Sequence, residues 1–124
     1  MNQEDQAVIP SLNFFHETAM SIAWRAYIAK GLGDVEKSKI LYAEALPWET
    51  RAADLVKDHH NMEPTRSVLY RSAASMAMNC GKYDEAERLI KIALEGTPPP
   101  EIKWELRDLR REIRKKRKEE VWQR

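Results

Sequence analysis

Shifting the sequence by 48 residues aligns it with itself. Under that shift, small residues, large apolar residues and a glycine fall on residues of the same kind. The matched pairs are Ala26 with Ala74, Ala29 with Ala77, Gly33 with Gly81, Tyr42 with Ile90, Ala45 with Ala93 and Leu46 with Leu94. Repeated units of two helices bury a shared core when they stack on each other. The self-match therefore predicts two stacked helical hairpins.

Helix-forming residues dominate the whole chain. Only four Gly occur among the 124 residues, and β-branched residues never form the alternating runs of a strand. We therefore expect an all-α fold in one domain, residues 1–124, long enough to bury a core without metals or disulfides. Residues 1–11 are expected to be flexible. The first hairpin should span 12–60, the second 63–97, and a terminal helix over 99–122 should cap the second hairpin.

The second helix of the first hairpin contains Pro47, which removes one backbone hydrogen bond and costs about 3 kcal/mol inside a helix. The apolar positions nevertheless keep helical phase across it, at Leu41, Ala45, Trp48, Ala52 and Leu55. One kinked helix from about Asp34 to about His59 is therefore favoured, with two separate helices as the alternative.

The helix boundaries follow from glycine and proline. The first helix should run from about Leu12 to Lys30. The stretch GLGD that follows should end it, because glycine tolerates a left-handed helix cap. The third should open at Pro64, which suits a first helical position, and end before Gly81.

The two remaining helices are expected over 84–94 and 99–122. The final helix carries one apolar stripe, made of Ile102, Leu106, Leu109 and Ile113. Beyond Ile113 the stripe gives way to charged residues, so the last turns are expected to project from the body or to fray.

The second hairpin resembles the tetratricopeptide repeat (TPR) family. Its second helix carries small, large and small residues at steps of four and three, followed by a proline. These are Ala86, Ile90, Ala93 and Pro98, while Tyr70, Ala74 and Gly81 match the family's aromatic, small and turn positions. The stretch EPTRSVLYRSAASMAMNCGKYDEAERLI is also similar to small bacterial proteins of this repeat type. The first hairpin matches less well, since Ser38 and Arg25 replace the usual alanine and leucine.

The resemblance implies a protein-binding groove on the concave face, formed by the first helix of each hairpin. The matching positions are Val68, Arg71, Ser75, Met78 and Asn79 in the second hairpin, and Ala23, Tyr27 and Lys30 in the first. A helix or a flat protein surface is the favoured ligand. The alternative is a peptide whose carboxylate is held by Arg71 with Lys30 and whose backbone is bonded by Asn79.

No catalytic, metal or cofactor motif accompanies this pattern. The glycines of GLGDVEKSK follow no strand and lack a third glycine, so they predict a turn rather than a phosphate site. His59 and His60 are adjacent and point apart on a helix, so we expect them to complement a helix dipole rather than to bind zinc. We interpret the chain as non-enzymatic.

Trp24, Tyr27, Trp48 and Tyr70 are interpreted as packing between helices. The small residues of SAASMAMNC would leave room for such large side chains on facing helices. Met76 and Met78 are weaker candidates for an adaptable apolar contact with a partner.

The strongest charge signal is RREIRKKRKEE. From Glu101 onward the chain has ten Lys or Arg against six Asp or Glu, and before it eleven against fourteen. Arg114, Lys115, Lys116, Arg117 and Lys118 are therefore candidates for contact with an anionic partner. A solvated helix end accounts for the same residues.

Two functions remain. The first is an adaptor that binds another protein through the groove and the terminal helix, and the second is a nucleic-acid accessory protein that uses the basic end. A homo-oligomer is compatible with both. The lone Cys80 and the lack of an apolar run of about 20 residues predict a cytoplasmic protein that does not contact a membrane.

Overall fold

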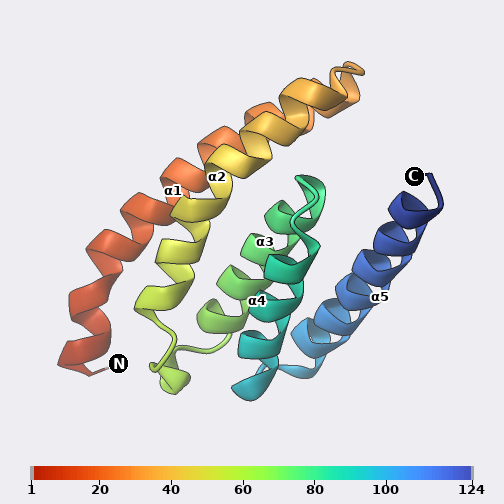
Figure 1. Cartoon of the computed structure of the whole chain (residues 1–124). Helices are drawn as coiled ribbons and strands as arrows, with labels where there is room; N and C mark the ends of the chain where they lie inside the picture. Colours follow the sequence, from red (N-terminus) through yellow and green to blue (C-terminus); the bar gives the residue numbers. More distant parts are fainter. Residues whose placement is uncertain (1, 124) are drawn as a thin grey trace.

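The computed structural model describes residues 2–123, and over that range all regular secondary structure is helical, with no strand. The helices are α1 (Gln3–Gly31), α2 (Val35–Leu55), α3 (Thr65–Asn79), α4 (Tyr83–Glu95) and α5 (Pro100–Gln123), with a short 3-10 helix at His60–Met62. Helices α1 and α2 form one antiparallel hairpin and α3 and α4 a second (Figure 1). Helix α2 packs on α3, and α5 packs on α3 and α4. The predicted all-α arrangement of two hairpins and a terminal helix is confirmed.

The two hairpins turn in the same way. Gly33 and Gly81 adopt φ angles of 85° and 79°, in the left-handed region where glycine is least strained. Two backbone hydrogen bonds close each turn, and those of the second are offset by 48 residues from those of the first. They join Gly33 N to Lys30 O (3.0 Å), Asp34 N to Ala29 O (2.9 Å), Gly81 N to Met78 O (3.0 Å) and Lys82 N to Ala77 O (2.8 Å). The self-match in the sequence thus records one helix-ending motif used twice.

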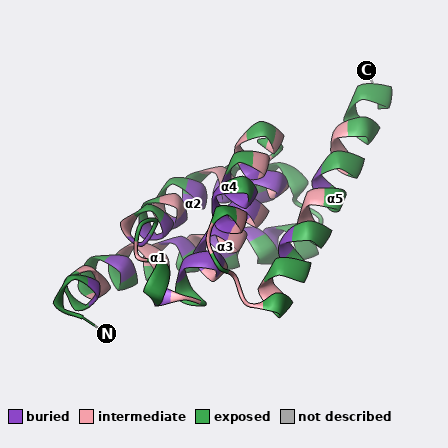
Figure 2. Ribbon diagram, turned by 90° about the horizontal axis from the view of Figure 1, so that it is seen from below, coloured by how far each residue is buried: buried purple, intermediate pink, exposed green. Residues whose placement is uncertain are grey.

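The core lies between the helices of the two hairpins, where small side chains let backbones approach (Figure 2). Four repeat-matched alanines, Ala26, Ala45, Ala74 and Ala93, have no exposed surface. Around them pack the larger side chains of Tyr70, Leu89 and Ile90, also fully buried. Alternation of small and large residues is what gives a helical interior its close packing.

The expected flexible segment over residues 1–11 is wrong from Gln3 onward, because α1 begins there rather than at Leu12. The Asn2 side chain caps the helix by accepting from Asp5 N at 2.8 Å. Asp5, only 1% exposed, accepts hydrogen bonds from His59 Nδ1 (2.6 Å) and Asn61 Nδ2 (2.5 Å). The start of α1 is thereby held to the connection between α2 and α3, which is a contact between residues distant in the sequence.

Helix α2 passes through Pro47 without a break, as favoured, but ends at Leu55 instead of His59. The ring centroids of Phe15 on α1 and Trp48 lie 6.0 Å apart. The Arg51 guanidinium carbon lies over both rings, 5.5 Å from the centroid of Phe15 and 5.7 Å from that of Trp48. This aromatic contact is made by the residue that directly follows the proline, and it offsets part of the cost of the backbone hydrogen bond that proline removes.

The two hairpins are joined at one end by Arg66, whose side chain is 2% exposed. Its guanidinium donates to the carbonyl of Lys57, after α2, at 2.6 Å and to that of Ile92, in the last turn of α4, at 3.2 Å. A cation is favoured at these helix C-terminal ends, where carbonyl groups lack intrahelical partners. Gly96 leaves the necessary space, since a Cβ there would lie 2.4 Å from Arg66 Nη1.

Helix α5 covers the second hairpin with the predicted stripe, in which Leu106 and Ile113 are fully buried. Its last turns remain helical and lie beside the start of α4, where Arg117 pairs with Asp84 at 2.8 Å, so they neither fray nor leave the body of the molecule.

Candidate binding groove

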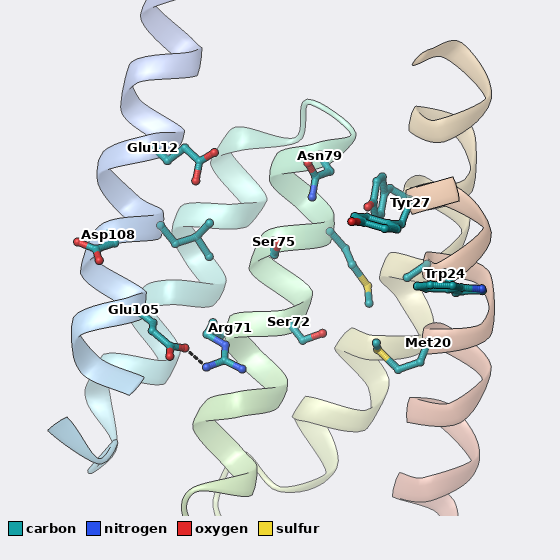
Figure 3. Close-up of a pocket in the computed structure, with 14 residues that line it drawn as sticks. Met20, Trp24, Tyr27, Arg71, Ser72, Ser75, Asn79, Glu105, Asp108 and Glu112 are labelled. Atoms are coloured by element: carbon teal, nitrogen blue, oxygen red, sulfur yellow. Dashed lines mark hydrogen bonds and ion pairs between the residues drawn. The ribbon is translucent and has the colours of Figure 1, made fainter. Parts of the chain in front are cut away.

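A groove of about 780 Å³ lies on the face formed by α1, α3 and α5 (Figure 3). It exists because the first hairpin contacts the second through α2, while α1 is not among the helices packed on α3. Helix α1 forms one wall, α5 forms the opposite wall, and α3 forms the floor. This volume is within the range that is typical of ligand-binding pockets.

The α1 wall is aromatic. Trp24 and Tyr27 are 61% and 63% exposed, and their rings stack at a centroid distance of 5.7 Å. Met20, one turn earlier, extends this surface and is 42% exposed. The opposite side of this part of α1 carries Ala19 and Ala26, both buried, so small residues pack inward here while Met20, Trp24 and Tyr27 line the groove.

The α5 wall is acidic. Glu105, Asp108 and Glu112 recur at steps of three and four residues, so they share one side of the helix. Figure 3 shows Glu105 and Glu112 directed from α5 toward the groove, across from Trp24 and Tyr27, and Asp108 at the outer edge of the helix. The apolar stripe of α5 faces the second hairpin, which leaves this acidic side lining the groove.

The floor is small and polar. It consists of Ser72, Ser75 and Asn79 of α3, with Arg71 at one end. Arg71 forms an ion pair with Glu105 that closes this end of the floor against α5. Three carboxylates therefore line the groove against a single cation, and that cation is already paired.

Four of the six partner-binding residues predicted from the sequence, Tyr27, Arg71, Ser75 and Asn79, line this groove together. Lys30 and Met78 line a second, smaller hollow of about 280 Å³, which Asn79 also borders. Met78 is only 7% exposed, so most of its side chain belongs to the core. Arg71 and Lys30 do not line the same hollow, and Arg71 is already paired with Glu105. The two cations are therefore not placed to bind one peptide carboxylate together.

The groove also contains residues that sequence reasoning missed. Trp24 is the main one. The interpretation as interhelical packing is wrong for Trp24 and Tyr27, because both are mostly exposed, although Tyr27 is also among the predicted partner-binding residues. The same interpretation is confirmed for Tyr70, which is buried and donates to Asp54 at 2.7 Å. The acidic spacing of Glu105, Asp108 and Glu112 was visible in the sequence, but nothing local relates it to α1.

The candidate anionic-partner contacts on the end of α5 divide into two sets. Arg114 pairs with Glu87 at 3.1 Å, and Arg117 pairs with Asp84 at 2.8 Å and Glu87 at 3.3 Å. Lys115, Lys116 and Lys118 form no ion pair within residues 2–123. The two arginines thus bind the chain's own α4, and the three lysines are left for other contacts.

No group of three or more metal-ligating side chains gathers among the described residues. The sequence predicts that His59 complements a helix dipole. Its Nδ1 instead forms a hydrogen bond with the Asp5 carboxylate. Burial raises the pKa of the Cys80 thiol, which disfavours the reactive thiolate. Within residues 2–123, no helix combines the length and the hydropathy needed to cross a bilayer.

Comparisons with protein-family models, with curated proteins and with solved structures each find no match.

Proposed function

We propose that this chain is a non-catalytic protein-interaction module of the cytoplasm, which binds another protein or peptide through the groove between α1 and α5. The observation that carries the proposal is the stacked, mostly exposed pair Trp24 and Tyr27 on a concave surface. Aromatic side chains are enriched at the centres of protein interfaces, where they bury large areas at a low cost in conformational entropy.

The likeness to tetratricopeptide repeats supports the same surface. In that family the first helix of each hairpin lines the concave face, and here α1 and α3 have those places in the chain order. Helix α5 adds the acidic wall, so the terminal helix takes part in the groove as well as capping the second hairpin.

Nucleic-acid binding by the basic end of α5 is the weaker alternative. Two of its five cations are already paired with Asp84 and Glu87 of α4. The acidic groove beside it would repel a phosphate backbone.

The test is capture of partner proteins on immobilised full-length protein, quantified by mass spectrometry. Replacing both Trp24 and Tyr27 with alanine should lower the capture of specific partners by about tenfold or more, as for a pair of central interface aromatics. Both side chains are exposed, so the helical circular dichroism signal should be unchanged.

Trp104→Ala is the matched control. Trp104 is 67% exposed on α5 but does not line the groove, so its removal should leave capture as it is. Equal losses in the groove and control variants would contradict a groove-specific interaction.

A further inference from the structure

We propose that the groove of one chain receives the C-terminal end of α5, residues 114–123, from a second copy of the same chain. This inference rests on the proposed function, because it uses the same groove and names an occupant for it. Both the groove and the occupant are present in one sequence, so the proposal is open to a direct test.

The acidic wall defines the charge of the occupant. Glu105 and Asp108 are 53% and 64% exposed even though they pair with Arg71 and Arg111. Glu112 forms no ion pair within residues 2–123. A ligand that brings cations gains on this wall, whereas a ligand that brings carboxylates is repelled.

The aromatic wall defines the rest of the occupant. Trp24, Tyr27 and Met20 present apolar surface directly across from the carboxylates (Figure 3). Ring faces attract ammonium and guanidinium groups as well as other aromatic rings. The matching ligand is therefore a segment that carries both cations and an aromatic or aliphatic residue.

The end of α5 combines these residue types, with three lysines that are unpaired within residues 2–123 ahead of an apolar tip and the two carboxylates Glu119 and Glu120 between them. Lys115 and Lys118 are exposed and form no ion pair within the described part of the chain. Val121 and Trp122, one turn further on, are 64% and 88% exposed. Nothing within residues 2–123 covers this apolar tip. The arginines on the preceding turns, Arg114 and Arg117, are paired with α4.

The end of α5 does not reach the groove of its own chain. Glu105 and Glu112 of the acidic wall belong to the same continuous helix, which runs on to Gln123 without a turn. Its final turns line the second hollow instead, where Lys116 and Gln123 lie with Lys30 and Tyr83. A second copy supplies the occupant, and because tip and groove are different surfaces the contact is heterologous.

Sedimentation velocity of the full-length chain, over a range of concentrations, tests for this contact. We expect concentration-dependent association in low salt that weakens about tenfold between roughly 50 and 500 mM NaCl, as screening reduces the attraction between tip and groove. A chain that remains monomeric at every concentration and salt would overturn the inference.

Two full-length variants place the contact. Glu112→Lys reverses a charge in the groove, and the double change Lys115→Glu with Lys118→Glu reverses the tip. Each variant alone should associate at least about tenfold more weakly than the wild type. Lys91→Glu is the matched control, since Lys91 is exposed on α4 outside both surfaces and its reversal should leave association unchanged.

Mixing the groove variant with the tip variant separates docking from a structural defect. The Glu112→Lys chain keeps an unaltered tip, and the tip variant keeps an unaltered groove, so the mixture should form heterodimers that grow no further. Failure of the mixture to associate, or self-association that survives both reversals, would overturn the inference. Either result leaves the proposed function standing, because capture through Trp24 and Tyr27 tests the groove with any partner.

Discussion

The two hairpins share a turn and differ in almost everything else. Helices α1 and α2 have 29 and 21 residues, whereas α3 and α4 have 15 and 13. The second hairpin is covered by α5 and holds the largest buried side chains, Tyr70, Leu89 and Ile90. The first hairpin exposes Trp24 and Tyr27 instead. A common helix-ending motif therefore sets the hairpin geometry and leaves helix length and surface free to diverge.

The longer hairpin holds its extra length with buried polar contacts as well as with apolar packing such as that of Phe15 on Trp48. At its far end Asp5 is buried with His59 and Asn61, and nearer the middle the fully buried Glu49 pairs with His16 at 2.8 Å. Buried polar groups of this kind require their partners, because each is costly when left unpaired. Substitutions at matched positions of the two hairpins test how far the likeness extends.

The largest effect is expected from a charge at the matched alanines. Ala45→Asp and Ala93→Asp each place a carboxylate where the wild-type residue has no exposed surface. Each should lower the free energy of unfolding by about 4 kcal/mol, since a buried charge without a partner is among the most destabilising changes. Urea denaturation of both variants measures this loss. An unchanged midpoint for either variant would show that the matched positions in the two hairpins are not equivalent.

A smaller and equal effect is expected at the turns. Gly33→Ala and Gly81→Ala meet no atom within 4 Å, so the cost is only that of a positive φ angle. Each should destabilise by about 1–2 kcal/mol. Gly31→Ala is the control, because it also meets open space but lacks a positive φ, and it should not destabilise. Unequal losses at the two turns would show that the hairpins tolerate strain differently.

A pH effect should be specific to the first hairpin. The hydrogen bond from His59 holds the pKa of the Asp5 carboxyl below its usual value, against an opposing effect of burial. The stability that Asp5 contributes is therefore present above the unfolded carboxyl pKa of about 4, and is lost as pH falls through the lower folded pKa.

Thermal unfolding between about pH 2 and 6 measures that contribution. Asp5→Asn should flatten the fall in melting temperature at acid pH, and Glu17→Gln, an exposed change on the same helix, should not. A wild-type acid profile in the Asp5 variant would contradict the anchoring role.

The smallest effect is expected from removing the end of α5. Truncation before Arg114 keeps Ile113, the last buried residue, and removes the ion pairs to Asp84 and Glu87. Exposed pairs contribute little, so the loss of stability should be at most about 1 kcal/mol and smaller at high salt. A larger loss in urea denaturation would mean that the second hairpin depends on the whole of α5.

Much of this fold could be predicted from the sequence because its determinants are local. A glycine in the left-handed region ends a helix wherever it occurs, and periodic alanines identify a close-packed side. Gly33, Gly81, Ala45 and Ala93 were all placed in this way. The start of α1 was missed because Asn2 caps a helix that only the distant His59 and Asn61 hold in place.

The groove could be predicted only in part, for the same physical reason. Tyr27 and Ser75 follow from the positions of repeat hairpins. Whether Trp24 is covered depends on which helix lies across from it, and that helix is α5, about 80 residues later in the chain. The pairing of Arg71 with Glu105, which removes Arg71 from the alternative carboxylate site with Lys30, depends on the same distant approach.

Arg66 has a consequence for how the molecule opens. Its guanidinium, on α3, bonds the Ile92 carbonyl within its own hairpin and the Lys57 carbonyl after α2, so separating the hairpins would break the buried bond to Lys57. Repeat arrays commonly lose their units one at a time, because each unit contacts only its neighbours. Here that bond adds to the cost of separating the units, and amide protons at the end of α2 should exchange with solvent in the same opening event that separates the hairpins.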